Sequence, residues 1–194
     1  MSCSNPEAPE TNGHTTLQVF DTASNTLDST TNITALSSNV EDHDRYNHMA
    51  VAPDGRVFVS ITDDSRPAIS SIVVFDAGGT EIDAYPLPIE DDMPQEMDVS
   101  PDGTKLAVGA ITTGNGSQQS YIIDLSDDSI TTIATDMASV AYSPDGLYLY
   151  GVFDAAEATT YRVIDTATNT EVDSIPVVDG VRIIVTPGLP FVRN

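Results

Sequence analysis

One repeated position in the sequence carries four different polar side chains that could bind a ligand together. Each of the four lies five residues before a proline, at positions 53, 101, 144 and 187, and they are His48, Glu96, Ser139 and Arg182. An imidazole, a carboxylate, a hydroxyl and a guanidinium can hold a small polar ligand or a metal if the fold gathers them at one mouth. A wet channel mouth also accepts polar residues with no such role. We therefore predict ligand-binding residues here and assign none of them to catalysis.

Two acidic segments lead into this position, residues 41–48 and 90–96. Their candidate metal ligands are Asp42, His43, Asp44, Asp91 and Asp92. Clustered carboxylates suit Ca²⁺, whereas the imidazoles favour zinc or another transition metal. Neither segment has the spacing of a calcium-binding helix–loop–helix motif. Ca²⁺ is thus the candidate cofactor, and no organic cofactor is predicted.

Nucleophilic catalysis finds little support in the sequence. There is no G-x-S-x-G elbow, and the three histidines, 14, 43 and 48, accompany no obvious nucleophile. The residue types therefore favour a protein that binds over one that catalyses.

The elements that position these residues follow from a repeat. Residues 49–59, 97–108 and 140–150 share an alternating apolar strand, a Pro-Asp-Gly turn and a second strand, and residues 183–192 keep the pattern without the aspartate. The turn prolines are spaced by 48, 43 and 43 residues. Proline and glycine supply the backbone angles of a tight turn, so each copy predicts a β-hairpin.

A second hairpin lies between successive copies, with apolar strands that end at Asp21, Asp76, Asp124 and Asp165. Two hairpins per repeat of ~43 residues give four strands, the content of a β-propeller blade. The chain is therefore predicted to be all-β, a propeller domain over 16–194 after a disordered tail over 1–15. Whole blades are expected over about 48–87, 96–134 and 138–177, and the fourth combines hairpins near 17–31 and 181–193.

The repeat over residues 161–177 resembles the YVTN-family β-propeller repeat, which is similar to WD40 repeats in architecture. Phe191, Val192, Arg193 and Asn194 match the tetrapeptide that names the family at its second and fourth positions. The resemblance covers residues 17–194 and implies a propeller. Related propellers include surface proteins, secreted binding proteins and lactonase-like and quinoprotein-like enzymes. The family commonly has seven blades, so four implies a small closed ring, half of an eight-bladed homodimeric ring, or a fragment.

Composition narrows the classes further. The chain has 30 acidic and 7 basic residues, a formal net charge of -23, and one lysine, Lys105. Such a surface repels phosphate, so nucleic-acid binding is excluded. No apolar run is long enough to span a membrane. The acidity fits an ordinary exported protein of low isoelectric point or one adapted to high salt.

The one cysteine, Cys3, stands near the start of the polar tail. The stretch from Cys3 resembles the start of a mature lipoprotein, so a lipid anchor is expected there. We expect a non-enzymatic extracellular, cell-surface or periplasmic propeller that binds a protein or glycan, touching a membrane only through that anchor. The alternative is a metal-dependent lactonase-like hydrolase with its site at the channel mouth.

Salt adaptation predicts a strong dependence of stability on ionic strength. The thermal midpoint should rise steeply between low salt and molar KCl, because salt screens repulsion among carboxylates. Circular dichroism melts across a KCl series measure this. A midpoint that stays constant would remove the salt-adaptation hypothesis.

Overall fold

The computed structural model describes residues 16–32 except 22, 48–63, 69–88, 92–112, 116–133, 136–155 and 158–177. All regular structure in these segments is β-strand, joined by turns. Among these residues, no helix is long and apolar enough to cross a membrane. The predicted tail over 1–15 and the hairpin near 181–193 lie outside the described residues.

In the described segments, fourteen strands form four antiparallel sheets, in which each strand pairs with its neighbour in sequence. Sheet 1 contains β1 (Thr16–Asp21) and β2 (Thr26–Asn32). Sheet 2 contains β3 (Met49–Val51), β4 (Val57–Asp63), β5 (Ile69–Phe75) and β6 (Glu81–Pro86). Sheet 3 contains β7 (Asp92–Val99), β8 (Lys105–Thr112), β9 (Gln118–Asp124) and β10 (Ile130–Ile133). Sheet 4 contains β11 (Ser139–Tyr142), β12 (Tyr148–Ala155), β13 (Ala158–Asp165) and β14 (Thr170–Val177).

The predicted Pro-Asp-Gly hairpins are confirmed in sheets 2, 3 and 4. Gly55, Gly103 and Gly146 have φ angles of 90°, 72° and 72°, which glycine adopts without the strain that a Cβ would add. Each glycine N–H donates to the carbonyl three residues earlier, closing the turn. The repeat therefore codes for one turn geometry used three times.

The second set of hairpins is also confirmed, and aspartates organise its turns. Asp21, Asp76, Asp124 and Asp165 each accept a hydrogen bond from the backbone N–H two residues later. A carboxylate that bonds to its own backbone in this way fixes a turn. Part of the acidity is thus local turn chemistry.

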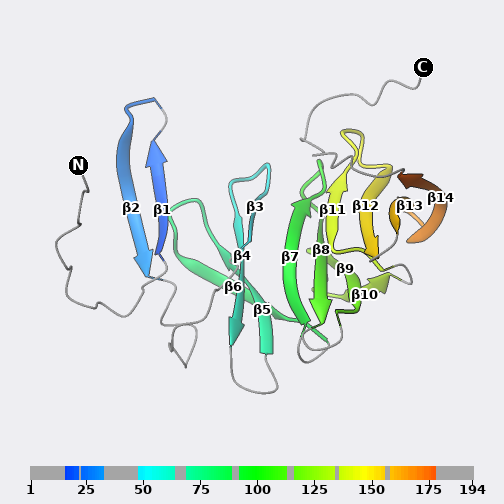
Figure 1. Cartoon of the computed structure of the whole chain (residues 1–194). Coiled ribbons are helices and arrows are strands. Elements are labelled where there is room, and N and C mark those ends of the chain that lie inside the picture. The colour runs from blue at the N-terminus through cyan, green and yellow to red at the C-terminus, as the bar shows by residue number, and fades with distance from the viewer. Residues whose placement is uncertain are drawn as a thin grey trace, which may run out of the picture.

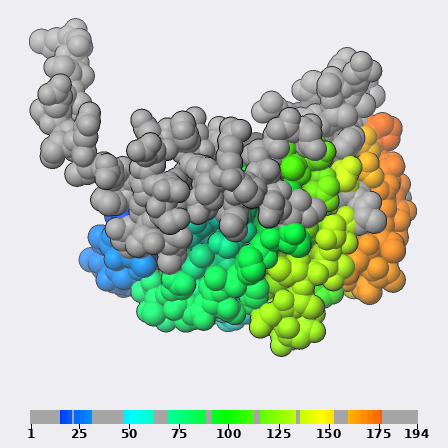
Figure 2. All heavy atoms as spheres, turned by 90° about the horizontal axis from the view of Figure 1, so that it is seen from below, coloured from blue at the N-terminus to red at the C-terminus, as the bar shows by residue number. Residues whose placement is uncertain are grey.

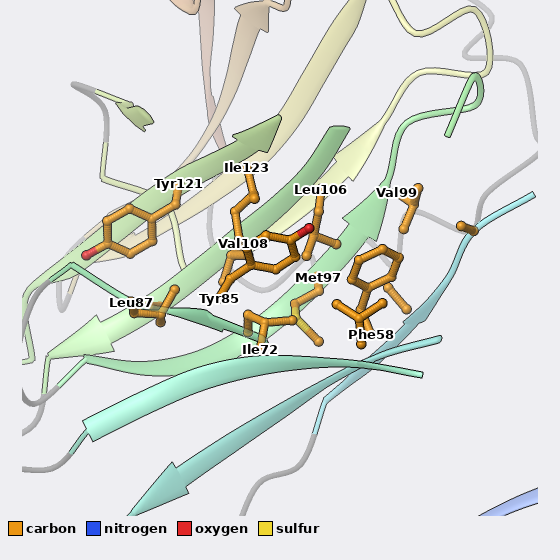
Figure 3. Close-up of a cluster of buried hydrophobic side chains, with 14 residues drawn as sticks. Phe58, Ile72, Tyr85, Leu87, Met97, Val99, Leu106, Val108, Tyr121 and Ile123 are labelled. Carbon is orange, nitrogen blue, oxygen red and sulfur yellow. The ribbon is translucent and has the colours of Figure 1, made fainter. Parts of the chain in front are cut away.

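The sheets stack in chain order, and their inner strands β3, β7 and β11 lie side by side (Figure 1). A buried cluster joins sheets 2 and 3 through Phe58, Ile72, Tyr85, Met97 and Ile123 among others (Figure 3). Other clusters join sheet 3 to sheet 4 and sheet 1 to sheet 2. This stacking of four-stranded sheets around their first strands is the arrangement of propeller blades.

Polar contacts between turns add to the stacking. The guanidinium of Arg56 donates to the carbonyl of Gly103 at 3.1 Å, and the ammonium of Lys105 donates to that of Thr166 at 3.0 Å. At the other junction, the hydroxyl of Thr31 donates to the carbonyl of Gly79 at 2.6 Å. Neighbouring sheets are therefore also joined at their turns.

One boundary differs from the expectation. Sheet 3 begins at Asp92, four residues before the blade boundary predicted at 96, so residues 92–96 of the acidic segment 90–96 are strand. Asp92 and Pro94 are buried in β7, and the strand bulges between Pro94 and Glu96. The bulge shifts the alternation by one residue, which hid the strand in the sequence pattern.

Two isoleucines of sheet 2 test whether burial between sheets dominates stability. Ile72 is fully buried in the cluster between sheets 2 and 3, whereas Ile82 is exposed in β6. We expect Ile72→Ala to lower the free energy of unfolding by about 2–5 kcal/mol. We expect Ile82→Ala to change it by less than about 0.5 kcal/mol. Urea unfolding of both variants measures the difference, and equal losses would contradict this stacking.

Candidate functional site

Three of the four predicted ligand-binding residues fall within the described part of the chain. His48 directly precedes β3, Glu96 lies in β7 and Ser139 begins β11. These are the inner strands of neighbouring sheets, as the repeat predicted. Arg182 lies outside the described residues, so its place in this set stays a prediction.

His48 and Glu96 are close enough to interact electrostatically. Burial lowers the pKa of the His48 imidazole, and the nearby charge of Glu96 opposes that shift. The backbone N–H of His48 donates to the hydroxyl of Ser60 at 2.8 Å, which fixes the residue beside β4. Its buried Nε2 has no hydrogen-bond partner among the described residues. An imidazole and a carboxylate on the inner strands of neighbouring sheets are therefore near each other.

Asp92 is the one predicted metal ligand in the described segments, and it has no exposed surface. Its Oδ1 accepts a hydrogen bond from the hydroxyl of Thr112 at 2.5 Å, and its Oδ2 accepts one from the hydroxyl of Tyr121. Tyr121 is fully buried as well, and burial followed by this bond raises its pKa. Asp92 thus anchors β7 to β8 and β9.

The remaining metal candidates, Asp42, His43, Asp44 and Asp91, lie outside the described residues, as does the lipidation candidate Cys3. Within the described segments, no three His, Cys, Asp or Glu side chains gather closely enough to hold a metal ion. A Ca²⁺ site in segment 41–48 stays a prediction.

The structure adds a pocket that the sequence prediction missed, beside the inner strands and their Pro-Asp-Gly turns. We call it the central pocket; it has a volume of about 430 Å³. Sheets 2, 3 and 4 all contribute to its wall. The lining residues are Met49, Ala50, Val51, Pro53, Met97, Asp98, Val99, Pro101, Tyr142, Ser143 and Pro144.

Asp98 is the single charged side chain that lines the central pocket. It is half-buried, and its Oδ2 accepts a hydrogen bond from the backbone N–H of Tyr142 at 2.6 Å. Burial raises the pKa of the Asp98 carboxyl, the charge of Glu96 adds to the rise, and the backbone hydrogen bonds oppose it. A carboxylate held in apolar surroundings interacts strongly with a cation or a hydrogen-bond donor.

Tyr142 supplies a second polar group at the pocket. Its side chain is buried, and its hydroxyl has no hydrogen-bond partner among the described residues. Burial raises the pKa of this hydroxyl, and Asp98 adds to the rise, so the group stays a neutral donor. The central pocket therefore has largely apolar walls and one carboxylate, and its lining residues include the hydroxyl-bearing Tyr142 and Ser143.

A signal for Asp98 was present in the repeat. The corresponding residues of the neighbouring copies are Ala50 and Ala141, three residues before the turn proline as Asp98 is. A single aspartate among alanines departs from the repeat as clearly as the four unlike residues at the strand start, two positions earlier. The repeat draws attention first to that strand start, where all four copies differ.

Comparison with known proteins supports the fold alone. No family model matches the sequence, and no curated protein matches it. Hydrazine synthase of Kuenenia stuttgartiensis is similar over 84% of this chain and 43% of its own, with a TM-score of 0.62 and 20% identity. The β-propeller domain of the trilobed protease of Pyrococcus furiosus, described as having an open velcro topology, is similar over 69% of this chain, with a TM-score of 0.52 and 21% identity. The present chain also spans 43% of the trilobed protease chain, so it covers less than half of the matched chain in either structure.

The pKa of Asp98 generates a prediction with a defined sign. The pKa of Asp98 is higher in the folded state than in the unfolded state, so ionising this carboxyl destabilises the fold. The contribution of this group to the free energy of unfolding is therefore greatest at low pH and falls as pH rises through the folded-state pKa. The free energy of unfolding of Asp98→Asn, relative to the wild type, should therefore rise as pH increases above ~4. Urea unfolding across pH measures it, with the exposed turn residue Asp127→Asn as the charge-matched control. A difference independent of pH would contradict the assignment.

On the fold the observations agree: in sheet order, in the packing of its inner strands and in its structural likenesses, the chain is built as a β-propeller.

Proposed function

We propose that this chain is an exported, YVTN-type β-propeller that acts as a non-enzymatic binding module for a protein or glycan ligand. The observation that carries the proposal is the central pocket, where three blades present apolar walls around Asp98. Concave, largely apolar sites with a few convergent polar groups are typical of ligand binding. No cofactor is needed for this role.

The chemistry of the pocket indicates which part of a ligand enters it. Met49, Val51 and Val99 supply apolar contact, while Asp98 accepts hydrogen bonds and attracts positive charge. The net charge of -23 draws cations toward the whole surface. An apolar group that carries a cation, such as a basic side chain of a partner protein, fits these features best.

The proposed location is the cell surface or another extracellular or periplasmic site, with Cys3 as the lipid anchor. The repeat resembles those of surface and secreted propellers, and the polar tail carries the one cysteine where a tether needs it. Such a location places the acidic propeller among external ligands, and it requires no membrane contact beyond the anchor.

One observation favours a second candidate, a metal-dependent lactonase-like hydrolase. The buried Nε2 of His48 has no partner among the described residues, and Glu96 lies close enough to affect its pKa. An imidazole beside a carboxylate can hold a metal together with further ligands. That site would lie next to the central pocket, since His48 and Glu96 directly precede the lining residues Met49 and Met97.

Calorimetry with short peptides tests the binding proposal. Acetyl-Leu-Lys-Leu-amide is the probe, acetyl-Leu-Glu-Leu-amide and maltotriose are the comparison ligands, and molar KCl screens unspecific attraction. We expect the lysine peptide to bind best. Asp98→Asn should weaken it about tenfold, since a hydrogen bond to a charged group contributes about 1.5 kcal/mol or more. Asp127→Asn should leave it unchanged.

A lactone hydrolysis assay with added Ca²⁺ or Zn²⁺ separates the two candidates. The binding module predicts no turnover above the metal alone. Metal-dependent turnover that is lost in His48→Ala and Glu96→Gln would establish the hydrolase instead. Equal binding of all three ligands, or none, would refute the assigned role of Asp98.

A further inference from the structure

Each sheet has a preceding face, turned toward the earlier sheet of the chain, and a following face, turned toward the later one. On the preceding faces of sheets 3 and 4, inner-strand residues are buried, namely Met97, Val99, Val140 and Tyr142. The corresponding residues of sheet 2, Met49 and Val51, are each 58% exposed. In the described part of the chain, sheet 1 has only two strands, which cover the outer part of this face.

The preceding face of sheet 1 is open as well. Phe20 directly precedes the turn residue Asp21 and is 57% exposed. Its counterparts, which directly precede the turn aspartates of sheets 2, 3 and 4, are Phe75, Ile123 and Ile164, all buried. Phe20 therefore occupies a position that a neighbouring sheet covers everywhere else.

The following face of sheet 4 is incompletely covered. Ile175 of β14 is 42% exposed and lies opposite the half-buried Tyr161 of β13. The same pair in sheet 2 is Tyr85 opposite Ile72, and both are buried against sheet 3. No described sheet follows sheet 4.

These two open faces are the two halves of an interface that already exists inside the chain. Between sheets 2 and 3, Tyr85 and Ile123 belong to one buried cluster (Figure 3). Their counterparts at the open faces are Ile175 and Phe20. The repeat thus gives the two ends complementary positions, as neighbouring repeat units have.

The two faces lie at opposite ends of the array of sheets. Figures 1 and 2 show β1 and β2 at one end and β13 and β14 at the other. The chain also spans 43% of the chain that forms the β-propeller domain of the trilobed protease, so its sheets match part of a larger propeller. Two such arcs, joined end to end twice, close a ring with twofold symmetry.

We propose that a second copy of this chain covers both open faces, so that two copies form one continuous ring of eight blades. Sheet 4 of each copy packs against sheet 1 of the other, which places Ile175 beside the other copy's Phe20. This inference is independent of the ligand proposed for the central pocket.

The charge sets the conditions of the test. Each copy carries a formal charge of -23, so association at low salt has to overcome repulsion that salt screens. Sedimentation equilibrium of the full chain in about 2 M KCl should give twice the chain mass of 20.6 kDa, with dissociation promoted at low salt. A single-copy mass in high salt would overturn the proposal.

Three variants with the same substitution locate the contact. Phe20→Glu and Ile175→Glu should each give the single-copy mass with an unchanged β-sheet circular dichroism spectrum, because a buried unpaired carboxylate opposes association. Ile82→Glu is the control: Ile82 is 53% exposed in β6, within the array, and its variant should keep the two-copy mass. A two-copy mass in either end variant would refute the assigned faces. The wild-type mass decides the matter if a variant fails to fold.

Discussion

Sheets 2 and 3 are apolar on both faces, so each of them has to be covered twice. In β8 the five consecutive residues from Leu106 to Ala110 are buried, with Leu106 packed toward sheet 2 and Ala107 toward sheet 4. A sheet of this kind cannot stand alone in water, because either uncovered face loses the free energy of apolar burial. The stacking of sheets in series follows from this requirement, and so does the placing of inner strands around one centre.

Close packing between sheets 3 and 4 also restricts the size of a side chain. A Cβ added to Gly109 of β8 would lie 2.3 Å from the carbonyl oxygen of Ala138, an atom of the backbone that cannot move aside easily. Sheet 4 thus approaches sheet 3 as near as a glycine permits. The repeat supplies the spacing between sheets, and single small residues decide how closely they meet.

The fold could be predicted from the sequence because the same hairpin patterns occur in several copies. The Pro-Asp-Gly turns and the turn aspartates each fix a local conformation through bonds within a few residues, and local chemistry of this kind survives averaging over copies. Three copies of one hairpin made the strand order predictable.

The site was predicted less well, because it depends on departures from the repeat and on contacts distant in sequence. The sequence pattern predicts that Asp92 lies in a loop, whereas it is a strand residue paired with Tyr121 across sheet 3. The pattern of its own strand does not single out Asp98, because its backbone partner Tyr142 belongs to the next sheet. Spacing within one strand cannot show either contact.

The acidity of the chain has a structural component that the fold makes visible. Hydrogen bonds from neighbouring hydroxyls and backbone N–H groups lower the pKa values of six turn aspartates, which are Asp21, Asp54, Asp102, Asp124, Asp145 and Asp165. These carboxylates stay ionised to lower pH than usual, and the stability they add is lost only as pH falls through their folded-state values. The same carboxylates therefore fix the turn conformations and contribute to the negative charge of the surface.

The bond between Lys105 and the carbonyl of Thr166 affects how this protein can be handled chemically. Lys105 is the one side-chain amine in the sequence, and its ammonium is already used to join sheet 3 to the turn between β13 and β14. Acylation by amine-reactive dyes, surface-coupling reagents or cellular acetyl donors would remove the positive charge and the donor together. Attachment through this amine would thus loosen the junction between two blades.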